Sequence, residues 1–163
     1  MKIPRFDNAN ILTIGDAMLD RYWHGETHRV SAEAPIPVID VGSIEDRPGG
    51  AANVALNVAT LGAASSLIAA TGQDEMSDIL ESKLTSSGID CQFIKVEGMS
   101  TITKVRLVSR SQQMIRADFE ALFNIDVDQV LKGMDLVPEY DSVVLSDYDK
   151  GLFSDPSSII ENA

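Results

Sequence analysis

The sequence predicts an α/β fold, in which a parallel sheet with flanking helices carries a small antiparallel lid. Short apolar, β-branched runs alternate with stretches of helical composition along the chain, an order that is typical of parallel sheets. Two segments of alternating apolar and polar residues interrupt this order, as expected for strands with one exposed face. With 163 residues and 44% hydrophobic content, the chain has the size of a single domain with one core.

The core elements are predicted in order along the chain. Residues 11–14 form a β-branched run that ends at Gly15-Asp16, so the carboxyl end of this first strand should open onto a site. An alanine-rich helix is expected over residues 51–61, with Gly62 as its stop signal. The remaining predicted elements are strands 66–71, 92–96 and 142–146 and helices 75–87 and 128–137.

Residues 26–41 and 102–117 are the two segments predicted to form the lid. The first contains β-branched residues around two prolines, and the second alternates apolar with polar residues around Ser109-Arg110-Ser111. We expect both to form exposed antiparallel strands that cover the strand ends of the core.

The end of the chain indicates a piece of a longer domain. A helix that begins near residue 157 has only a turn or two before Ala163. The simplest interpretation is that residues 1–163 are an N-terminal part and that the C-terminal half is absent. A half-sheet without its remaining strands would expose an apolar edge.

The composition excludes several classes of protein. A net charge of −12 argues against binding of nucleic acid or of a membrane surface, because the field repels polyanions. An anionic ligand would need a local cluster of positive charge. The single Cys91 cannot form an internal disulfide, which favours a reducing compartment such as the cytoplasm. No apolar run has the length of a signal peptide or a membrane span.

Adjacent glycines lead into the helix predicted at residue 51. Bare backbone at Gly49 and Gly50 lets a ligand approach closely, and the helix start offers unpaired N–H donors. Asn53 adds a donor and an acceptor on the first turn. The alternative interpretation is that the two glycines form only a tight turn.

Two carboxylates follow the first predicted strand. Asp16 and Asp20 are suited to accept charge-assisted hydrogen bonds from vicinal sugar hydroxyls. The alternative for each is a capping or turn role, which aspartate favours.

A basic cluster is predicted on the second lid segment. Thirteen positions without an acid contain Lys104, Arg106, Arg110 and Arg116. Lys104 and Arg106 share one face of a strand, so both can converge on one anion such as a sugar phosphate. The alternative is that these charges suppress edge-to-edge pairing of an exposed strand. Arg116, beside Asp118 and Glu120, is expected to form a structural ion pair.

The segment 146–151 follows a predicted strand, at the edge of the sheet where open α/β folds bind ligands. Asp147 is expected to cap or hold the loop. His24 and His28 lie four residues apart without a nearby third ligand, so no metal site is predicted.

Taken together, these motifs resemble the N-terminal signature of the ribokinase (PfkB) family of carbohydrate kinases, from about Ile11 to the end of the chain. The family signature is similar to Gly49-Gly50-Ala51-Ala52-Asn53, and Gly15 to Tyr22 resembles its first strand and sugar-binding loop. Within the family, the likeness is greatest to the heptose 7-phosphate kinases, including the kinase half of their bifunctional form. The motifs of this subgroup are Asp20-Arg21-Tyr22-Trp23, Glu33-Ala34-Pro35, Arg47-Pro48, Thr101-Ile102-Thr103-Lys104, Gln112-Gln113 and Leu145-Ser146-Asp147-Tyr148.

The resemblance implies a ribokinase-like fold and a kinase that uses ATP and Mg²⁺. Its substrate would be D-glycero-D-manno-heptose 7-phosphate, whose C1 hydroxyl would accept the phosphoryl group. This reaction would belong to ADP-heptose synthesis for the lipopolysaccharide core. Lys104 and Arg106 would anchor the 7-phosphate, Asp20 would be the stronger sugar ligand, and Lys150 would lie near the nucleotide phosphates. The resemblance also implies a homodimer through the lid.

The family uses a late Gly-Ala-Gly-Asp motif, whose amides neutralise developing phosphate charge and whose aspartate deprotonates the acceptor hydroxyl. This sequence contains no such motif and no Walker loop, so we expect the chain itself to be inactive. Two alternatives remain open: a kinase of the same family for another sugar or a nucleoside, and a non-catalytic sugar-phosphate-binding or dimerisation module.

Overall fold

The structure, a computed structural model, describes residues 6–120, 122–137, 139–153 and 156–162. The strands are β1 (Asn10–Gly15), β2 (Ala17–Val30), β3 (Pro37–Gly50), β4 (Ala64–Gly72), β5 (Ile89–Val96), β6 (Thr103–Ser109), β7 (Gln112–Phe119) and β8 (Ser142–Ser146). The helices are α1 (Ala51–Thr60), α2 (Glu75–Ser86), α3 (Val127–Asp135) and α4 (Ser157–Asn162). Every predicted core element is found, with bounds that differ by a few residues. Within this described part, no helix is both long and apolar enough to cross a membrane.

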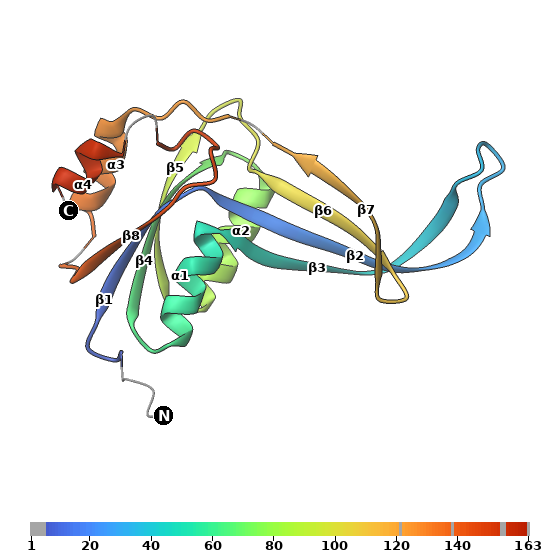
Figure 1. Ribbon diagram of the computed structural model, residues 1–163, viewed down its shortest axis with the longest axis horizontal. Helices are drawn as coiled ribbons and strands as arrows, with labels where there is room; N and C mark the ends of the chain where they lie inside the picture. The colour runs from blue at the N-terminus through green and yellow to red at the C-terminus, as the bar shows by residue number, and fades with distance from the viewer. Residues whose placement is uncertain (1–5, 121, 138, 154–155, 163) are drawn as a thin grey trace.

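The core is a parallel sheet with the strand order β5-β4-β1-β8. Helices α1 and α2 pack on one face, and α3 and α4 pack on the other (Figure 1). In β4, Leu67 and Ala69 belong to the cluster under α1 and α2, whereas Ile68 and Ala70 belong to the opposite cluster. Burial on both faces explains why the sequence shows these strands as continuous apolar runs. The predicted α/β fold is therefore confirmed.

The lid is a second sheet that extends away from the core (Figure 1), with the strand order β3-β2-β6-β7. The pairs β2–β3 and β6–β7 are antiparallel, as predicted, but β2 and β6 are parallel, so the lid is a mixed sheet. The reason lies in the core. Because β2 continues from β1 and β6 follows β5, both leave the same edge of a parallel sheet in the same direction.

The first lid segment is longer than the predicted 26–41. Strands β2 and β3 extend it to residues 17–50, so the predicted sugar-binding loop around Asp20 is part of a strand. Gly49 and Gly50 end a strand instead of forming a tight turn. The sequence did not predict strands at residues 17–25 and 42–50, because the polar residues on one face of these strand ends are typical of loops. The second segment lies close to the predicted 102–117, with Arg110 and Ser111 at its turn.

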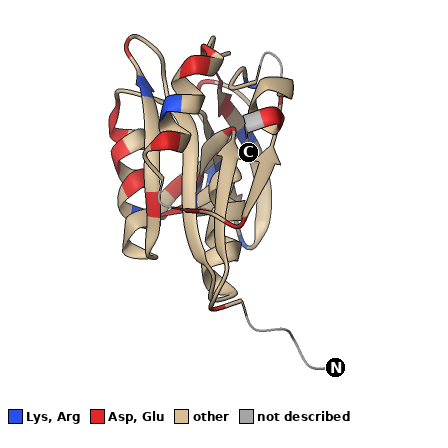
Figure 2. Cartoon of the chain, turned by 90° about the vertical axis from the view of Figure 1, so that its left-hand side faces the viewer, with Lys and Arg blue, Asp and Glu red and all other residues tan. Residues whose placement is uncertain are grey.

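The negative charge of the chain is distributed over many elements. Acidic residues lie on several helices, strands and loops in Figure 2, with fewer lysines and arginines scattered among them. An anionic ligand therefore has to be bound by a local group of cations, as the composition predicts.

Candidate functional site

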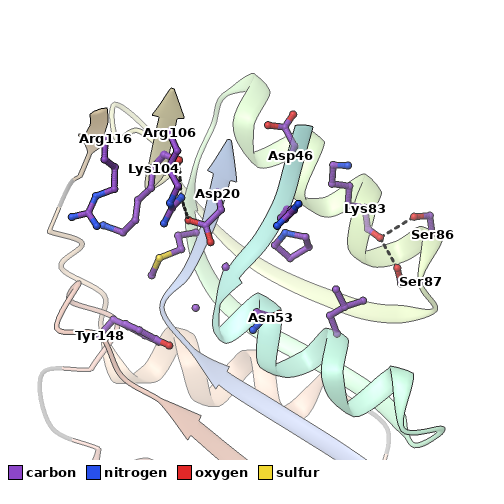
Figure 3. A pocket seen from close by; sticks show the side chains of 16 residues that line it. Asp20, Asp46, Asn53, Lys83, Ser86, Ser87, Lys104, Arg106, Arg116 and Tyr148 are labelled. Carbon is purple, nitrogen blue, oxygen red and sulfur yellow. Dashed lines mark hydrogen bonds and ion pairs between the residues drawn. The ribbon is translucent and has the colours of Figure 1, made fainter. Parts of the chain in front are cut away.

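A cavity of about 760 Å³ lies between one face of the lid and the N-terminal end of α1 (Figure 3). A volume of this size is typical of small-molecule sites. Most of the predicted substrate-site residues line it: Asp20, Gly49, Gly50, Asn53, Lys104 and Arg106. The structure thus brings together the glycine pair, one of the two carboxylates and the basic strand.

The lid presents charged side chains to this cavity because side chains alternate along its strands. Residues that lie opposite one another form rows across the four strands. Two rows on the cavity face are Arg47-Asp20-Lys104-Asp118 and Glu45-Tyr22-Arg106-Arg116. A row on the opposite face is Ile44-Trp23-Leu107-Ile115. The lid therefore has one charged face and one largely apolar face.

The glycine pair forms the floor of the cavity at the start of α1. Gly50 is the N-cap of α1 with φ 57° and ψ −134°, a conformation that side chains with a Cβ rarely adopt. At Gly49, a Cβ would overlap the side chains of Asp20 and Met18. The N–H of Ala51 donates to the Asp16 carbonyl at 3.0 Å. Asn53, on the first turn of α1, is exposed to the cavity (Figure 3).

Asp20 and Arg106 form an ion pair in the middle of the cavity face. Arg106 Nη1 donates to Asp20 Oδ1 at 2.6 Å and to the Lys104 carbonyl at 3.2 Å. The ring of Tyr22 lies beside two guanidinium groups, with the Cζ atoms of Arg47 and Arg106 at 4.6 and 5.2 Å from its centroid. Such contacts fix the orientation of arginine side chains. Arg106 is thus held in place before any ligand arrives.

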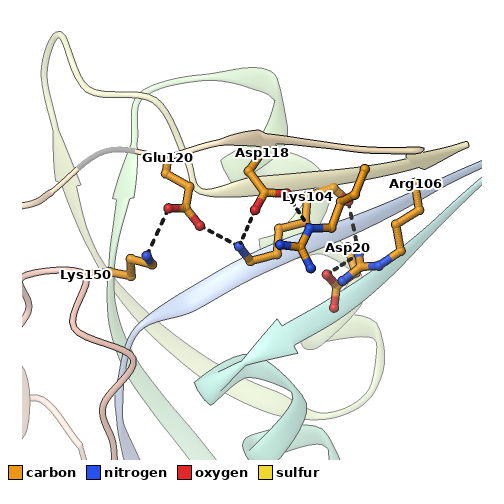
Figure 4. Close-up of polar contacts among 7 residues, drawn as sticks. Asp20, Lys104, Arg106, Asp118, Glu120 and Lys150 are labelled. Carbon is orange, nitrogen blue, oxygen red and sulfur yellow. Dashed lines mark hydrogen bonds and ion pairs between the residues drawn. The ribbon is translucent and has the colours of Figure 1, made fainter.

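Lys104 lies between two carboxylates (Figure 4). Its Nζ donates to Glu120 Oε1 at 2.5 Å and to Asp118 Oδ2 at 3.2 Å. Burial by itself would lower the pKa of Lys104, but the hydrogen bonds to Glu120 and Asp118 outweigh it and raise the pKa. Lys104 is therefore protonated and positively charged at neutral pH. The sequence did not predict that Glu120 would neutralise the charge of Lys104, because the two residues are 16 positions apart.

Lys150 lies in the loop after β8, and Glu120 connects it to the lid. Its Nζ donates to Glu120 Oε2 at 3.0 Å (Figure 4). The hydrogen bond from Lys104, and to a smaller extent that from Lys150, lowers the pKa of Glu120. The main chain of Lys150 is held as well, since Phe123 N–H donates to its carbonyl at 2.9 Å.

Asp16 does not line the cavity. Its side chain is buried, and its carboxylate accepts hydrogen bonds from the N–H groups of Tyr148, Lys150 and Leu152 at 2.8, 3.1 and 3.4 Å. The structure therefore places Asp16 in the loop-holding role that was the alternative at sequence level, and it corrects the expectation of direct sugar contact. Asp16 fixes the loop that carries Tyr148, and Tyr148 does line the cavity.

Arg110 is also not brought to the cavity. It occupies the turn between β6 and β7 with φ 49°, at the far end of the lid hairpin. Arg116 lines the cavity and forms the predicted ion pair, with its Nε 2.8 Å from Asp118 Oδ1. Because a strand rises about 3.3 Å per residue, nearly the full length of β6 separates Arg110 from Lys104.

Several lining residues were not predicted from the sequence. Lys83, Ser86 and Ser87 reach the cavity from the C-terminal end of α2 (Figure 3). Asp46 lines it from β3 and pairs with Arg21 at 2.7 Å. The sequence gives no signal for such contacts, because they depend on how α2 and β3 pack beside α1.

Among the described residues, no three His, Cys, Asp or Glu side chains come together as ligands for a metal ion. A divalent cation is therefore not assigned to this part of the chain. Burial raises the pKa of the Cys91 thiol to about 12, so Cys91 is not a nucleophile at neutral pH.

Comparison with protein families gives a match over nearly the whole chain. Residues 8–159 match the family described as pfkB family carbohydrate kinase. The chain is 49% identical to "Bifunctional protein HldE" of Aeromonas hydrophila over 99% of its own length and 34% of that protein. It is equally identical to the protein of the same name in Pseudomonas putida, over 100% of its own length and 35% of that protein. The chain thus spans about a third of the length of these relatives.

Solved structures of sugar kinases have the same fold. A carbohydrate kinase from Agrobacterium tumefaciens matches with a TM-score of 0.66 and 20% identity, over 84% of this chain and 45% of that one. A putative sugar kinase from Clostridium perfringens matches with a TM-score of 0.65 and 16% identity, over 95% and 46%. A ribokinase from Cryptococcus neoformans in complex with ADP matches with a TM-score of 0.55 and 19% identity, over 85% and 40%. At these identities the likeness concerns the fold, and it confirms the predicted ribokinase-like architecture.

Proposed function

Because the chain belongs to the pfkB family of carbohydrate kinases, we propose that its cavity binds D-glycero-D-manno-heptose 7-phosphate. The whole protein would transfer the γ-phosphoryl group of ATP to the C1 hydroxyl of this sugar, in ADP-heptose synthesis for the lipopolysaccharide core. The identity of 49% to proteins named "Bifunctional protein HldE" supports this choice of substrate. A reaction that consumes ATP is consistent with a cytoplasmic location.

One observation carries the proposal: the cationic lid strand and the glycine-helix entrance face the same cavity. Asp20 and Asn53 offer acceptors and a donor to sugar hydroxyls, and the bare backbone at Gly49 and Gly50 lets the ring approach. Lys104 and Arg106 lie on one face of β6 and would bind the 7-phosphate, the lysine as a point charge and the arginine as a planar donor.

ATP would supply the phosphoryl group. Of the residues in this chain, Lys150 is our candidate for contact with the nucleotide phosphates. Mg²⁺ is held mainly by nucleotide phosphates and a few carboxylates in kinases, and no cluster of the described residues provides a site for it. We expect the 163-residue chain to bind the sugar phosphate without turnover, since its sequence lacks the Gly-Ala-Gly-Asp motif.

The first test replaces both Lys104 and Arg106 with alanine. Calorimetry with heptose 7-phosphate, without nucleotide, should show affinity about 30-fold weaker than that of the unchanged chain, because two contacts to a dianion are lost. Binding of the heptose without its phosphate should weaken far less, by no more than the loss of the Arg106 partner of Asp20 causes. Replacing Lys95 and Lys132 with alanine removes the same charge outside the cavity and serves as the control.

Two outcomes would contradict this assignment. Equal losses for the two sugars would favour a kinase for an unphosphorylated sugar or a nucleoside. Failure of the unchanged chain to bind either sugar would contradict the proposed pocket.

We also propose that two copies of the protein associate through the apolar face of the lid. The row Ile44-Trp23-Leu107-Ile115 crosses all four lid strands. Ile44 and Ile115 are each 57% exposed, and Phe119 on β7 is 58% exposed. Large apolar side chains gathered on one exposed face are typical of protein interfaces. A second copy offers a face of the same kind.

The dimer is tested by replacing Ile115, an exposed member of this row, with glutamate. Because a charge in the middle of an apolar interface is costly to bury, we expect monomers at concentrations at which the unchanged chain dimerises. Analytical ultracentrifugation measures the difference. Leu61→Glu is the control, since Leu61 is 58% exposed, close to the 57% of Ile115, but lies at the end of α1. Loss of the dimer in both variants, or in neither, would contradict the lid interface.

A further inference from the structure

Glu120 joins two lysines that belong to different parts of the fold. Its two carboxylate oxygens accept separately, Oε1 from Lys104 Nζ at 2.5 Å and Oε2 from Lys150 Nζ at 3.0 Å. Lys104 lines the cavity from β6, whereas Lys150 lies in the loop after β8 (Figure 4). One side chain thus connects the phosphate end of the proposed sugar site with the loop to which we assign the nucleotide.

The two lysines differ in what else holds them. Lys104 has a second carboxylate partner, Asp118 Oδ2 at 3.2 Å, and its side chain is only 15% exposed. The main chain of Lys150 is anchored by Asp16 and Phe123, so its side chain stays within reach of Glu120. Glu120 itself is 36% exposed, and water can reach it. Of the residues in this network, Glu120 is therefore the one that can move at least cost.

We propose that Glu120 is a specificity-determining residue that holds the place of the substrate phosphate on Lys104. A phosphate dianion that enters the cavity displaces the Glu120 carboxylate from Lys104, and Glu120 keeps Lys150 as its counter-ion. A sugar without a phosphate leaves the pair of Glu120 and Lys104 intact. This inference rests on the proposed function, because it takes the ligand of the cavity to be a phosphorylated sugar.

Charge balance supports the exchange. Without a ligand, the three cations Lys104, Lys150 and Arg116 share only two carboxylates, so this group has an excess of positive charge that attracts an anion. A phosphate at the Lys104 ammonium would lie close to both carboxylates, and its repulsion from them falls when the Glu120 carboxylate moves away. A phosphate dianion attracts an ammonium group more strongly than a carboxylate monoanion does. Glu120 can leave without becoming unpaired, since Lys150 remains its partner.

The first experiment measures the affinity of the Glu120→Gln chain for heptose 7-phosphate by calorimetry. Because the Glu120 charge no longer competes with the phosphate for Lys104, we expect about fivefold tighter binding. A change of this size corresponds to the interaction free energy of a partly exposed ion pair. Binding of heptose without its phosphate should not change. Glu120→Ala should act in the same direction and serves as the second variant. The control is Asp78→Asn, which removes a carboxylate paired with Lys95 outside the cavity.

The second experiment replaces Lys150 with alanine. Glu120 then loses its other partner and is harder to displace from Lys104, so heptose 7-phosphate should bind about threefold more weakly, although Lys150 does not line the cavity. In the Glu120→Gln background, the same replacement should have no effect. Circular dichroism checks that each variant is folded.

The outcomes separate this inference from the proposed function. Weaker binding by Glu120→Gln and Glu120→Ala would overturn the inference, and so would a loss from Lys150→Ala that persists without Glu120. If the unchanged chain binds the two sugars equally well, the proposed function fails and the inference falls with it.

Discussion

Replacing Gly50 with alanine should lower the free energy of unfolding by about 3–5 kcal/mol, enough to unfold much of the protein. Gly50 has φ 57° and ψ −134°, a backbone conformation that is almost confined to glycine. A Cβ at this position would also overlap the main-chain carbonyl of Asp16, which cannot move like the end of a flexible side chain. The cost of the backbone strain and the cost of the steric overlap therefore add at Gly50, where β3 ends and α1 begins.

Urea denaturation of the Gly50→Ala and Gly62→Ala chains provides the comparison. Gly62 also has a positive φ, 94°, but a Cβ there would have no heavy atom within 4 Å. We expect Gly62→Ala to cost only about 1 kcal/mol, from backbone strain alone. Similar losses for the two variants would show that contact with Asp16 is unimportant.

Replacing Asp16 with alanine should cost about 3–4 kcal/mol of stability and release the loop 148–152. The buried carboxylate accepts from three main-chain N–H groups, and alanine would leave all three without their acceptor. Leu152 is 2% exposed, so water cannot readily replace the lost hydrogen bond there. Tyr148 would lose its fixed position beside the cavity.

Two measurements test this expectation. Urea denaturation gives the loss of stability, and hydrogen exchange should be faster at the amides of Tyr148, Lys150 and Leu152. Asp147→Ala is the matched control, because Asp147 lies in the same loop but is exposed and accepts only from Asp149 N–H among the hydrogen bonds recorded for the described residues. We expect it to cost about 0.5–1 kcal/mol. Unchanged exchange in Asp16→Ala would mean that other contacts hold the loop.

Most of the core could be predicted because its strands are buried on both faces. Such strands appear in the sequence as unbroken apolar runs, for example residues 66–71, and glycines such as Gly62 mark where helices end. The lid strands gave a weaker signal. Around Asp20 and Arg47 one face is charged and the other is mixed, so the pattern resembles a loop until the two strands are seen to pair.

The candidate site was predicted in its residue types but not in its contacts. Alternation along β6 was enough to place Lys104 and Arg106 on one face, and both line the cavity. Asp16 and Asp20, four residues apart, gave the same signal, yet one holds a loop and the other faces the cavity. Arg110 shares the charge of its neighbours but lies at the turn.

The sequence by itself determined the order of the core strands and helices along the chain, the alternation of β6 and the family, because these depend on local periodicity and on motifs in consecutive residues. Only the tertiary structure decided which charges meet. Arg106 reaches Asp20 across 86 residues, and Glu120 reaches Lys150 across 30. Sheet register and the packing of loops determine which of these residues pair, and the residues nearby in sequence contain no signal for either.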